Sequence, residues 1–149
     1  MNLEDLLSKN IVEEFSSSSS QIQQKISLAE ADIDAAKDTI IGKNKRSVEW
    51  AYAQAYNAML QIGTALMYSR NYRPKKGTGS HHWAVESYLK SEFKGLIAKN
   101  VLAVFGKARQ NRHEAVYDQV GLIGKTDAEG LITDTEYLLK TAKILLRIK

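Results

Sequence analysis

The feature that most constrains the fold is a long apolar repeat that begins near Ser47 and ends near Ser69. Its apolar side chains recur at steps of three and four residues, and they are Val48, Tyr52, Ala55, Met59, Ile62 and Leu66. This period is typical of an α-helix that buries one face. A stripe of small residues runs beside it, namely Ala51, Ala55, Ala58 and Ala65. Because small side chains let a neighbouring helix approach closely, we expect this helix to be the central one of a bundle.

The same periodicity predicts helices on both sides of the central one. A helix is expected up to Ile40, with Ser20 and Gln23 at the spacing of a capping box, and Gly42 and Asn44 are expected to end it. Later helices are expected to begin near Ser80, to span about Ala98 to Gln119, and to begin near Thr126. The stretch from Arg70 to Gly79 holds the only proline and reads as a surface loop.

The N-terminal residues 1–19 are expected to form an accessory segment outside the main bundle. Leucines, Ile11 and Phe15 recur there at spacings of three and four, which predicts a short amphipathic helix from Leu3 to Phe15. Five serines, Ser16 to Ser20, then break that helix, because serine favours caps over helix interiors. Residues 20–149 would form the bundle domain.

No convincing alternating strand, dinucleotide fingerprint or nucleophile elbow is found in the sequence, so we predict an all-α bundle of five or six helices. The chain has no cysteine, which excludes thiol catalysis and cysteine-zinc sites. The adjacent His81 and His82 would point about 100° apart on a helix, so we expect no metal site and no cofactor. No run of eighteen apolar residues or secretory signal is found, so a cytoplasmic protein without membrane contact is expected.

The charge of the chain is unevenly distributed. Residues 1–38 hold eight acidic against three basic residues, whereas residues 39–149 hold nine acidic against eighteen basic ones. A basic domain attracts polyanions, and this modest excess raises the prospect of RNA or nucleotide contact a little.

The stretch Phe105 to Asp118, FGKARQNRHEAVYD, is the richest in groups that could carry chemistry. On one helix Arg109, His113 and Tyr117 would share a face, with Arg112 beside them. Guanidinium groups bind phosphate through paired donors, and imidazole titrates near neutral pH, so this face suits a phosphate ligand. The alternative is a solvated helical face without a chemical role. The phosphate-binding candidates are Lys107, Arg109, Asn111 and Arg112.

Three segments together resemble the HEPN family of small helical-bundle proteins. They are EWAYAQAYNAMLQIGTALMYSRNYRP, SHHWAVESYL and RQNRHEAVYD, followed by the last predicted helix, and the likeness covers roughly residues 20–149. The resemblance implies an up-and-down four-helix bundle with one or two accessory helices, usually dimeric, with two polar segments lining one cleft. Many members are metal-independent RNases, often prokaryotic toxins paired with a nucleotidyltransferase antitoxin, while others bind RNA or nucleotides without catalysis.

The sequence departs from the family's active motif, which is an arginine, four to six residues, and a histidine. Arg109 and His113 are separated by three residues, and Tyr117 stands five positions beyond Arg112. RNA cleavage without metal needs a base that deprotonates a 2′-hydroxyl near neutral pH, and tyrosine with a pKa near 10 is a poor one. If catalysis survives, its candidate residues are Arg109, Arg112, His113 and Tyr117.

Three hypotheses follow. We favour a homodimeric RNA- or nucleotide-binding module with a degenerate catalytic motif, in which Arg109 and Arg112 hold phosphate. The second is a metal-independent endoribonuclease toxin of a HEPN/nucleotidyltransferase pair. The third is a non-catalytic structural partner protein that holds, for example, a nucleotidyltransferase. A homodimer is expected because the family dimerises and because Trp50, Tyr52, Met59 and Trp83 exceed what a thin bundle must bury.

Overall fold

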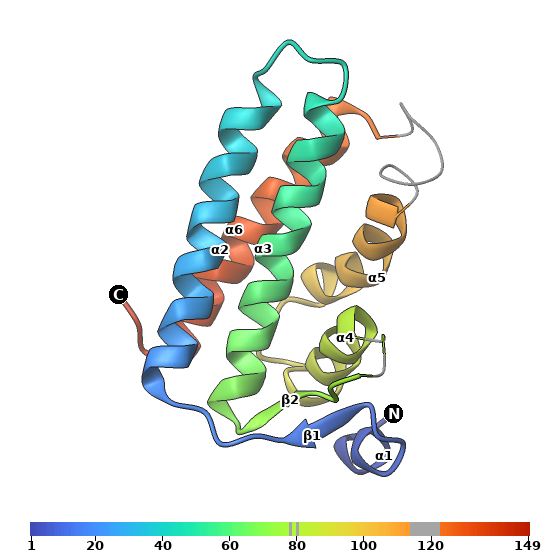
Figure 1. Ribbon diagram of the computed structural model, residues 1–149, viewed down its shortest axis with the longest axis vertical. Helices are drawn as coiled ribbons and strands as arrows, with labels where there is room; N and C mark the ends of the chain where they lie inside the picture. Colours follow the sequence, from blue (N-terminus) through green and yellow to red (C-terminus); the bar gives the residue numbers. More distant parts are fainter. Residues whose placement is uncertain (78, 80, 114–122) are drawn as a thin grey trace.

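The computed structural model describes residues 1–77, 79, 81–113 and 123–149 of the chain. Within these residues the fold is mainly helical, with one small two-stranded sheet, which confirms the predicted all-α class (Figure 1). The elements in chain order are α1 (Leu3–Ser8), β1 (Val12–Glu14), α2 (Ser19–Ile40), α3 (Ser47–Ser69), β2 (Tyr72–Pro74), α4 (His81–Glu92), α5 (Lys99–His113) and α6 (Lys125–Leu146).

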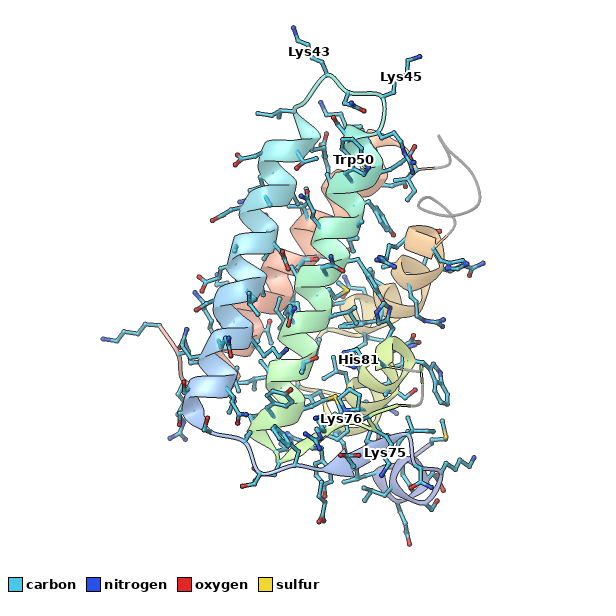
Figure 2. The ribbon with its side chains drawn as sticks, viewed as in Figure 1. Lys43, Lys45, Trp50, Lys75, Lys76 and His81 are labelled. Carbon is cyan, nitrogen blue, oxygen red and sulfur yellow. The ribbon has the colours of Figure 1, made fainter. Side chains whose placement is uncertain are left out.

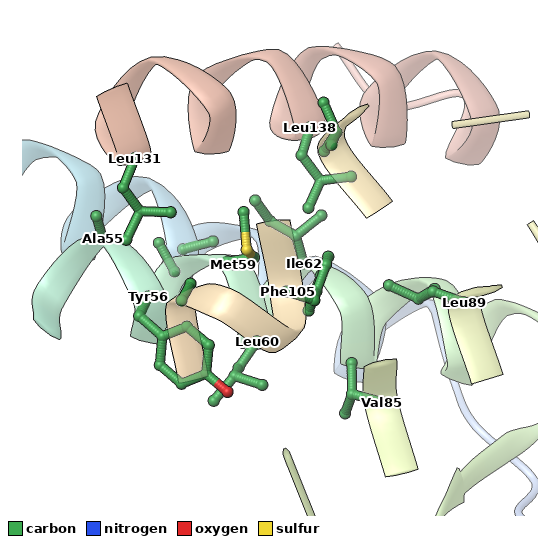
Figure 3. Packing of buried hydrophobic residues seen from close by; sticks show 14 of the residues in the cluster. Ala55, Tyr56, Met59, Leu60, Ile62, Val85, Leu89, Phe105, Leu131 and Leu138 are labelled. Carbon is green, nitrogen blue, oxygen red and sulfur yellow. The ribbon is translucent and has the colours of Figure 1, made fainter. Parts of the chain in front are cut away.

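Helix α3 is the central helix, as its apolar repeat predicts. It runs beside α2, packs against α6, and contacts α4 and α5 on its side away from α2 (Figure 1). Met59 and Ile62 of α3 are fully buried and lie in one cluster with Leu138 of α6 and Phe105 of α5 (Figure 3). The repeat therefore builds the core around which the shorter helices are placed.

A close approach between α3 and α4 depends on Gly63. A Cβ atom at this position would lie only 2.4 Å from Cγ1 of Val85 and 3.2 Å from Cδ1 of Leu89. Glycine thus lets α4 lie directly on the backbone of α3. This contact fixes the position of α4, which carries two of the polar side chains described below.

The predicted N-terminal helix from Leu3 to Phe15 is wrong beyond Ser8. Asn10 adopts a left-handed backbone conformation with φ of 56°, and β1 then pairs antiparallel with β2, with Val12 opposite Pro74. The expectation that the chain holds no strand is therefore wrong as well. Ile11 and Val12 are buried in this extended segment, as suits β-branched residues.

The helix caps differ from the predicted ones. Helix α2 begins after Ser18, whose hydroxyl accepts from the backbone N–H of Gln21, rather than at Ser20. At its other end α2 stops at Ile40, before Gly42 and Asn44, and neither of these residues adopts the left-handed conformation that often ends helices. Helix α6 begins after Gly124, whose N–H donates to the Asp127 carboxylate at 2.9 Å, which is close to the predicted start near Thr126.

Candidate functional site

Helix α5 presents the predicted basic stretch at its C-terminal end. Gly95, which has φ of 85°, lies in the connection between α4 and α5. Phe105 and Ala108 are buried against the core, as predicted, so the opposite residues of the last turn face outward. Arg109 and His113 lie one turn apart on this helix, which agrees with the predicted shared face. Val116, Tyr117 and the remainder of the stretch lie outside the described residues.

Arg112 is half-buried at the end of α5. Its Nε atom is buried and has no hydrogen-bond partner among the described residues. Lys107, Arg109 and His113 are exposed by contrast. An arginine N–H group that is removed from water and left without an acceptor is unfavourable, so this donor is available to an anionic ligand.

Arg109 faces a carboxylate on α4. Its Nε atom lies 3.7 Å from Oε1 of Glu86, whose side chain is only 11% exposed. Lys90 donates to Oε2 of the same carboxylate at 2.8 Å. A Cβ atom at Gly106 would lie 3.0 Å from Oε2, so glycine at that position lets α5 approach the carboxylate. Oε1 is buried without a hydrogen-bond partner among the described residues, so Glu86 and Arg109 attract each other without a close hydrogen bond.

Asn111, a predicted phosphate ligand, has a protein partner in the structure. Its side-chain amide donates to the hydroxyl of Tyr52 on α3 at 3.2 Å. Burial raises the pKa of the Tyr52 hydroxyl, while the bond from Asn111 opposes that rise. Asn111 therefore joins α5 to the central helix, and a phosphate contact would have to compete with this bond.

His82, for which the sequence analysis proposes no role, lies where the charges of Arg109 and Arg112 act on it. Its ring packs edge-on against the ring of Tyr56 on α3, with centroids 5.5 Å apart. Burial lowers the pKa of His82, and the positive charges of Arg112 and Arg109 lower it further. A neutral imidazole near two guanidinium groups can accept a proton at neutral pH.

The charges of Arg109 and Arg112 also affect the pKa of the Tyr56 hydroxyl. Burial raises this pKa, while Arg109 and Arg112 act in the opposite direction. The hydroxyl therefore stays protonated at neutral pH and can donate a hydrogen bond. We refer to Tyr56, His82, Glu86, Arg109 and Arg112 as the α3–α4–α5 junction. The signal that could have found His82 is a histidine at a helix start, but only tertiary packing relates it to arginines 27 and 30 positions later.

Four lysines outside the junction lie in two separate places. Lys43 and Lys45 lie at one end of the long axis, in the turn between α2 and α3, whereas Lys75 and Lys76 lie near the other end (Figure 2). These four lysines therefore do not form one basic patch. The junction is distinguished by the buried carboxylate of Glu86 and the half-buried Arg112 rather than by the number of its charges.

Neither a metal centre nor a membrane span is found in the part of the chain that the structure describes. No group of three or more histidine, cysteine, aspartate and glutamate residues there could hold a metal ion. None of the described helices combines the length and apolar character needed to cross a bilayer.

Neither a scan against models of protein families nor a search of curated proteins finds a match to this chain.

Proposed function

We propose that the chain is a homodimeric RNA- or nucleotide-binding module of the HEPN type, built as an up-and-down four-helix bundle with accessory helices. Arg109 and Arg112 hold phosphate at the α3–α4–α5 junction. The observation that carries the proposal is the buried Nε atom of Arg112, which has no hydrogen-bond partner among the described residues.

An anionic ligand would satisfy this donor. Leaving a buried N–H group unpaired costs about 1–3 kcal/mol, and a phosphate oxygen would recover much of that cost through a charge-assisted hydrogen bond. The planar guanidinium group presents paired donors that match phosphate geometry. Arg109, three residues earlier on the same helix, supplies a second charge on the same side of α5. A phosphodiester or nucleotide phosphate fits this arrangement better than a neutral ligand does.

Fluorescence anisotropy with a labelled single-stranded RNA tests the proposal. Arg112→Ala should weaken binding about tenfold, because it removes both the charge and the paired donors. Arg112→Lys should recover only part of the loss, since lysine keeps the charge but lacks the fork of donors. Lys140→Ala on α6 removes the same charge from an exposed position outside the junction and is the matched control. Equal weakening by Lys140→Ala and Arg112→Ala would reduce the binding to general electrostatic attraction and contradict the proposed site.

A metal-independent endoribonuclease is the second candidate function, and the placement of His82 favours it. The pKa of His82 is lowered, so its imidazole is neutral at pH 7 and could take the proton of a 2′-hydroxyl, while the two arginines stabilise the phosphate. This differs from the roles that the sequence suggested for His113 and Tyr117. His113 is exposed at the end of α5, and Tyr117 lies outside the described residues.

Incubation of the purified protein with RNA in EDTA separates the two candidates. The binding module leaves the RNA intact. An RNase of this site yields 2′,3′-cyclic phosphate ends, and loss of cleavage in His82→Gln but not in His113→Gln would assign the base to His82. Loss only in Tyr117→Phe would instead return the role to the tyrosine of the altered motif.

The proposed homodimer is supported by exposed tryptophans. Trp50 is 47% exposed and Trp83 is 36% exposed, whereas Tyr52 and Met59, which the sequence argument grouped with them, are buried within the core. Large exposed aromatic side chains are enriched in protein interfaces. Light scattering at micromolar concentration should give twice the mass of one chain, and a mass of one chain at every concentration would exclude the dimer.

A further inference from the structure

A polar hollow of about 270 Å³ opens between α2, α3 and the start of α4. It is lined by Asp32 and Lys25 of α2, by Asn57 and Gln61 of α3, and by the two histidines of α4. Figure 2 shows His81 at the start of α4, beside α3. The hollow therefore combines a carboxylate, an ammonium group, two amides and two imidazole rings.

The two amides are placed to read the edge of a planar ligand. Asn57 and Gln61 lie four residues apart on α3 and so project from the same face. No hydrogen bond joins either side-chain amide to another residue in the described part of the chain. Each amide offers a donor and an acceptor side by side, which is the arrangement by which asparagine and glutamine pair with the edge of a nucleobase.

The hollow adjoins the junction because they share His82. This residue lines the hollow, and its ring packs on the ring of Tyr56 with 5.5 Å between the centroids. The positive charges of Arg112 and Arg109 lower its pKa. A ligand that occupied both the hollow and the junction would pass over the side chain of His82. His82 therefore belongs to both the hollow and the junction, and a nucleotide carries a base and a phosphate that can occupy one each.

The volume of the hollow limits which part of a nucleotide it can hold. Pockets for whole drug-sized ligands measure about 300–1,000 Å³, so a hollow of 270 Å³ is too small for a complete nucleotide but accepts one flat ring system. The rings of His81 and His82 provide flat surfaces against which a base can stack, since imidazole is among the side chains that stack on unpaired bases. The carboxylate of Asp32, which is partly buried, adds an acceptor for an exocyclic amino group.

We infer that this hollow is a nucleobase subsite, which binds the base of the nucleotide whose phosphate lies at Arg109 and Arg112. The inference rests on the proposed function and adds that binding discriminates between bases, rather than reading phosphate alone. The discriminating residues are Asn57, Gln61 and Asp32. The same chemistry is offered by a free nucleotide and by a base turned out of a single RNA strand.

Isothermal titration calorimetry on the full chain tests the subsite. The probes are the four common ribonucleoside 5′-monophosphates, with ribose 5-phosphate as the ligand that has a phosphate but no base. The wild type should bind at least one nucleotide about tenfold more tightly than ribose 5-phosphate. Short homopolymeric RNA oligonucleotides form a second arm, which distinguishes a base within a strand from a free nucleotide by the tighter binder.

The decisive variant is Asn57→Ala/Gln61→Ala. It should bind all four nucleotides with the affinity of ribose 5-phosphate and leave the affinity for ribose 5-phosphate unchanged. Gln24→Ala, an exposed amide of α2 outside the hollow, should leave every affinity unchanged. Because Asn57 is exposed and Gln61 half-buried, the double variant should keep the wild-type circular dichroism spectrum.

The outcomes separate the two claims. If ribose 5-phosphate and all nucleotides bind equally to the wild type and lose affinity together in Arg112→Ala, the phosphate site stands and the base subsite is overturned. Base discrimination that persists in Asn57→Ala/Gln61→Ala would also overturn it. If neither ribose 5-phosphate nor any nucleotide or oligonucleotide binds, both the proposed function and the base subsite are overturned.

Discussion

The two sides of α3 are built on different principles. Towards α6, the interface holds apolar side chains such as Met59 and Leu138, and its buried Thr135 hydroxyl donates to the Leu131 carbonyl at 2.7 Å. Towards α4 and α5, buried polar atoms of Glu86 and Arg112 have no hydrogen-bond partner among the described residues. Native proteins leave few buried polar atoms unpaired, so the first side stabilises the fold and the second side is where a ligand is expected.

The largest loss of stability is expected from a substitution in the apolar interface between α3 and α6. Leu138→Ala removes a fully buried side chain and should lower the free energy of unfolding by about 2–5 kcal/mol, through lost burial and the cavity left behind. Urea denaturation followed by circular dichroism measures the loss. Leu28→Ala on α2, where the leucine is 43% exposed, is the control and should change stability by less than about 1 kcal/mol. Similar losses in both variants would contradict the assigned core.

A smaller effect is expected where α4 lies on α3. Gly63→Ala forces a methyl group to within 2.4 Å of Val85 and should lower the free energy of unfolding by about 1–3 kcal/mol, even though alanine is the better helix former. The double variant Gly63→Ala/Val85→Ala relieves this contact and should be less destabilised than the sum of the two single variants. A more stable Gly63→Ala protein would show that the two helices do not approach as described.

Glu86→Gln sharpens the comparison, because it changes the charge of the junction and hardly changes its shape. The carboxylate offsets the charge of Arg109, so its neutralisation should raise affinity for single-stranded RNA by up to about fivefold, which corresponds to about 1 kcal/mol. Anisotropy titration measures the gain. The control is Glu129→Gln on α6, an exposed carboxylate near Lys125, which should produce a smaller gain. Weaker RNA binding by Glu86→Gln would contradict the role assigned to Arg109.

The pH dependence of stability gives the smallest expected effect. His82 has its pKa lowered by burial, by Arg112, by His81 and by Arg109, whereas in the unfolded chain its pKa is near 6.5. The unfolded chain therefore binds more protons as the pH falls below about 6.5, so the stability that neutral His82 contributes is complete above this pH and is lost as the pH falls through the folded pKa.

The urea midpoint of the wild type should accordingly drop between about pH 7.5 and about pH 5.5. In His82→Gln the drop should be smaller, and the remaining part should reflect His81, whose pKa is also lowered by burial. His113→Gln serves as the control at an exposed position. An identical drop in wild type and His82→Gln would show that the folded protein does not hold His82 neutral.

The helices with long apolar repeats could be predicted from the sequence because local spacing decides them. The predicted bounds of α3, Ser47 and Ser69, agree with the structure, and so does the predicted end of α2 at Ile40. The three-residue strands could not be predicted in this way, because β1 owes its conformation to β2, some sixty residues later. The salt bridge between Glu13 and Arg73 at 2.7 Å joins the same two segments and is equally non-local.

The candidate site was predictable only in the part that lies on one helix. Arg109 and Arg112 are neighbours on α5, so spacing alone brought them together. Tyr56 and His82 come from α3 and α4, and the charges of the two arginines act on them only after the helices pack. The sequence predicts a phosphate contact for the side-chain amide of Asn111, whereas in the structure this amide donates to the hydroxyl of Tyr52. Tertiary contacts thus decide which predicted polar residues have partners and which do not.

The salt dependence of RNA binding tests the central claim, that Arg109 and Arg112 contact phosphate, most directly. Each phosphate contact on a single strand contributes about 0.7 to the slope of log affinity against log salt concentration. The variant Arg109→Gln/Arg112→Gln should therefore bind more weakly and with a slope that is less steep by about 1.4 than that of the wild type. The account is contradicted if the variant keeps the affinity and the slope of the wild type.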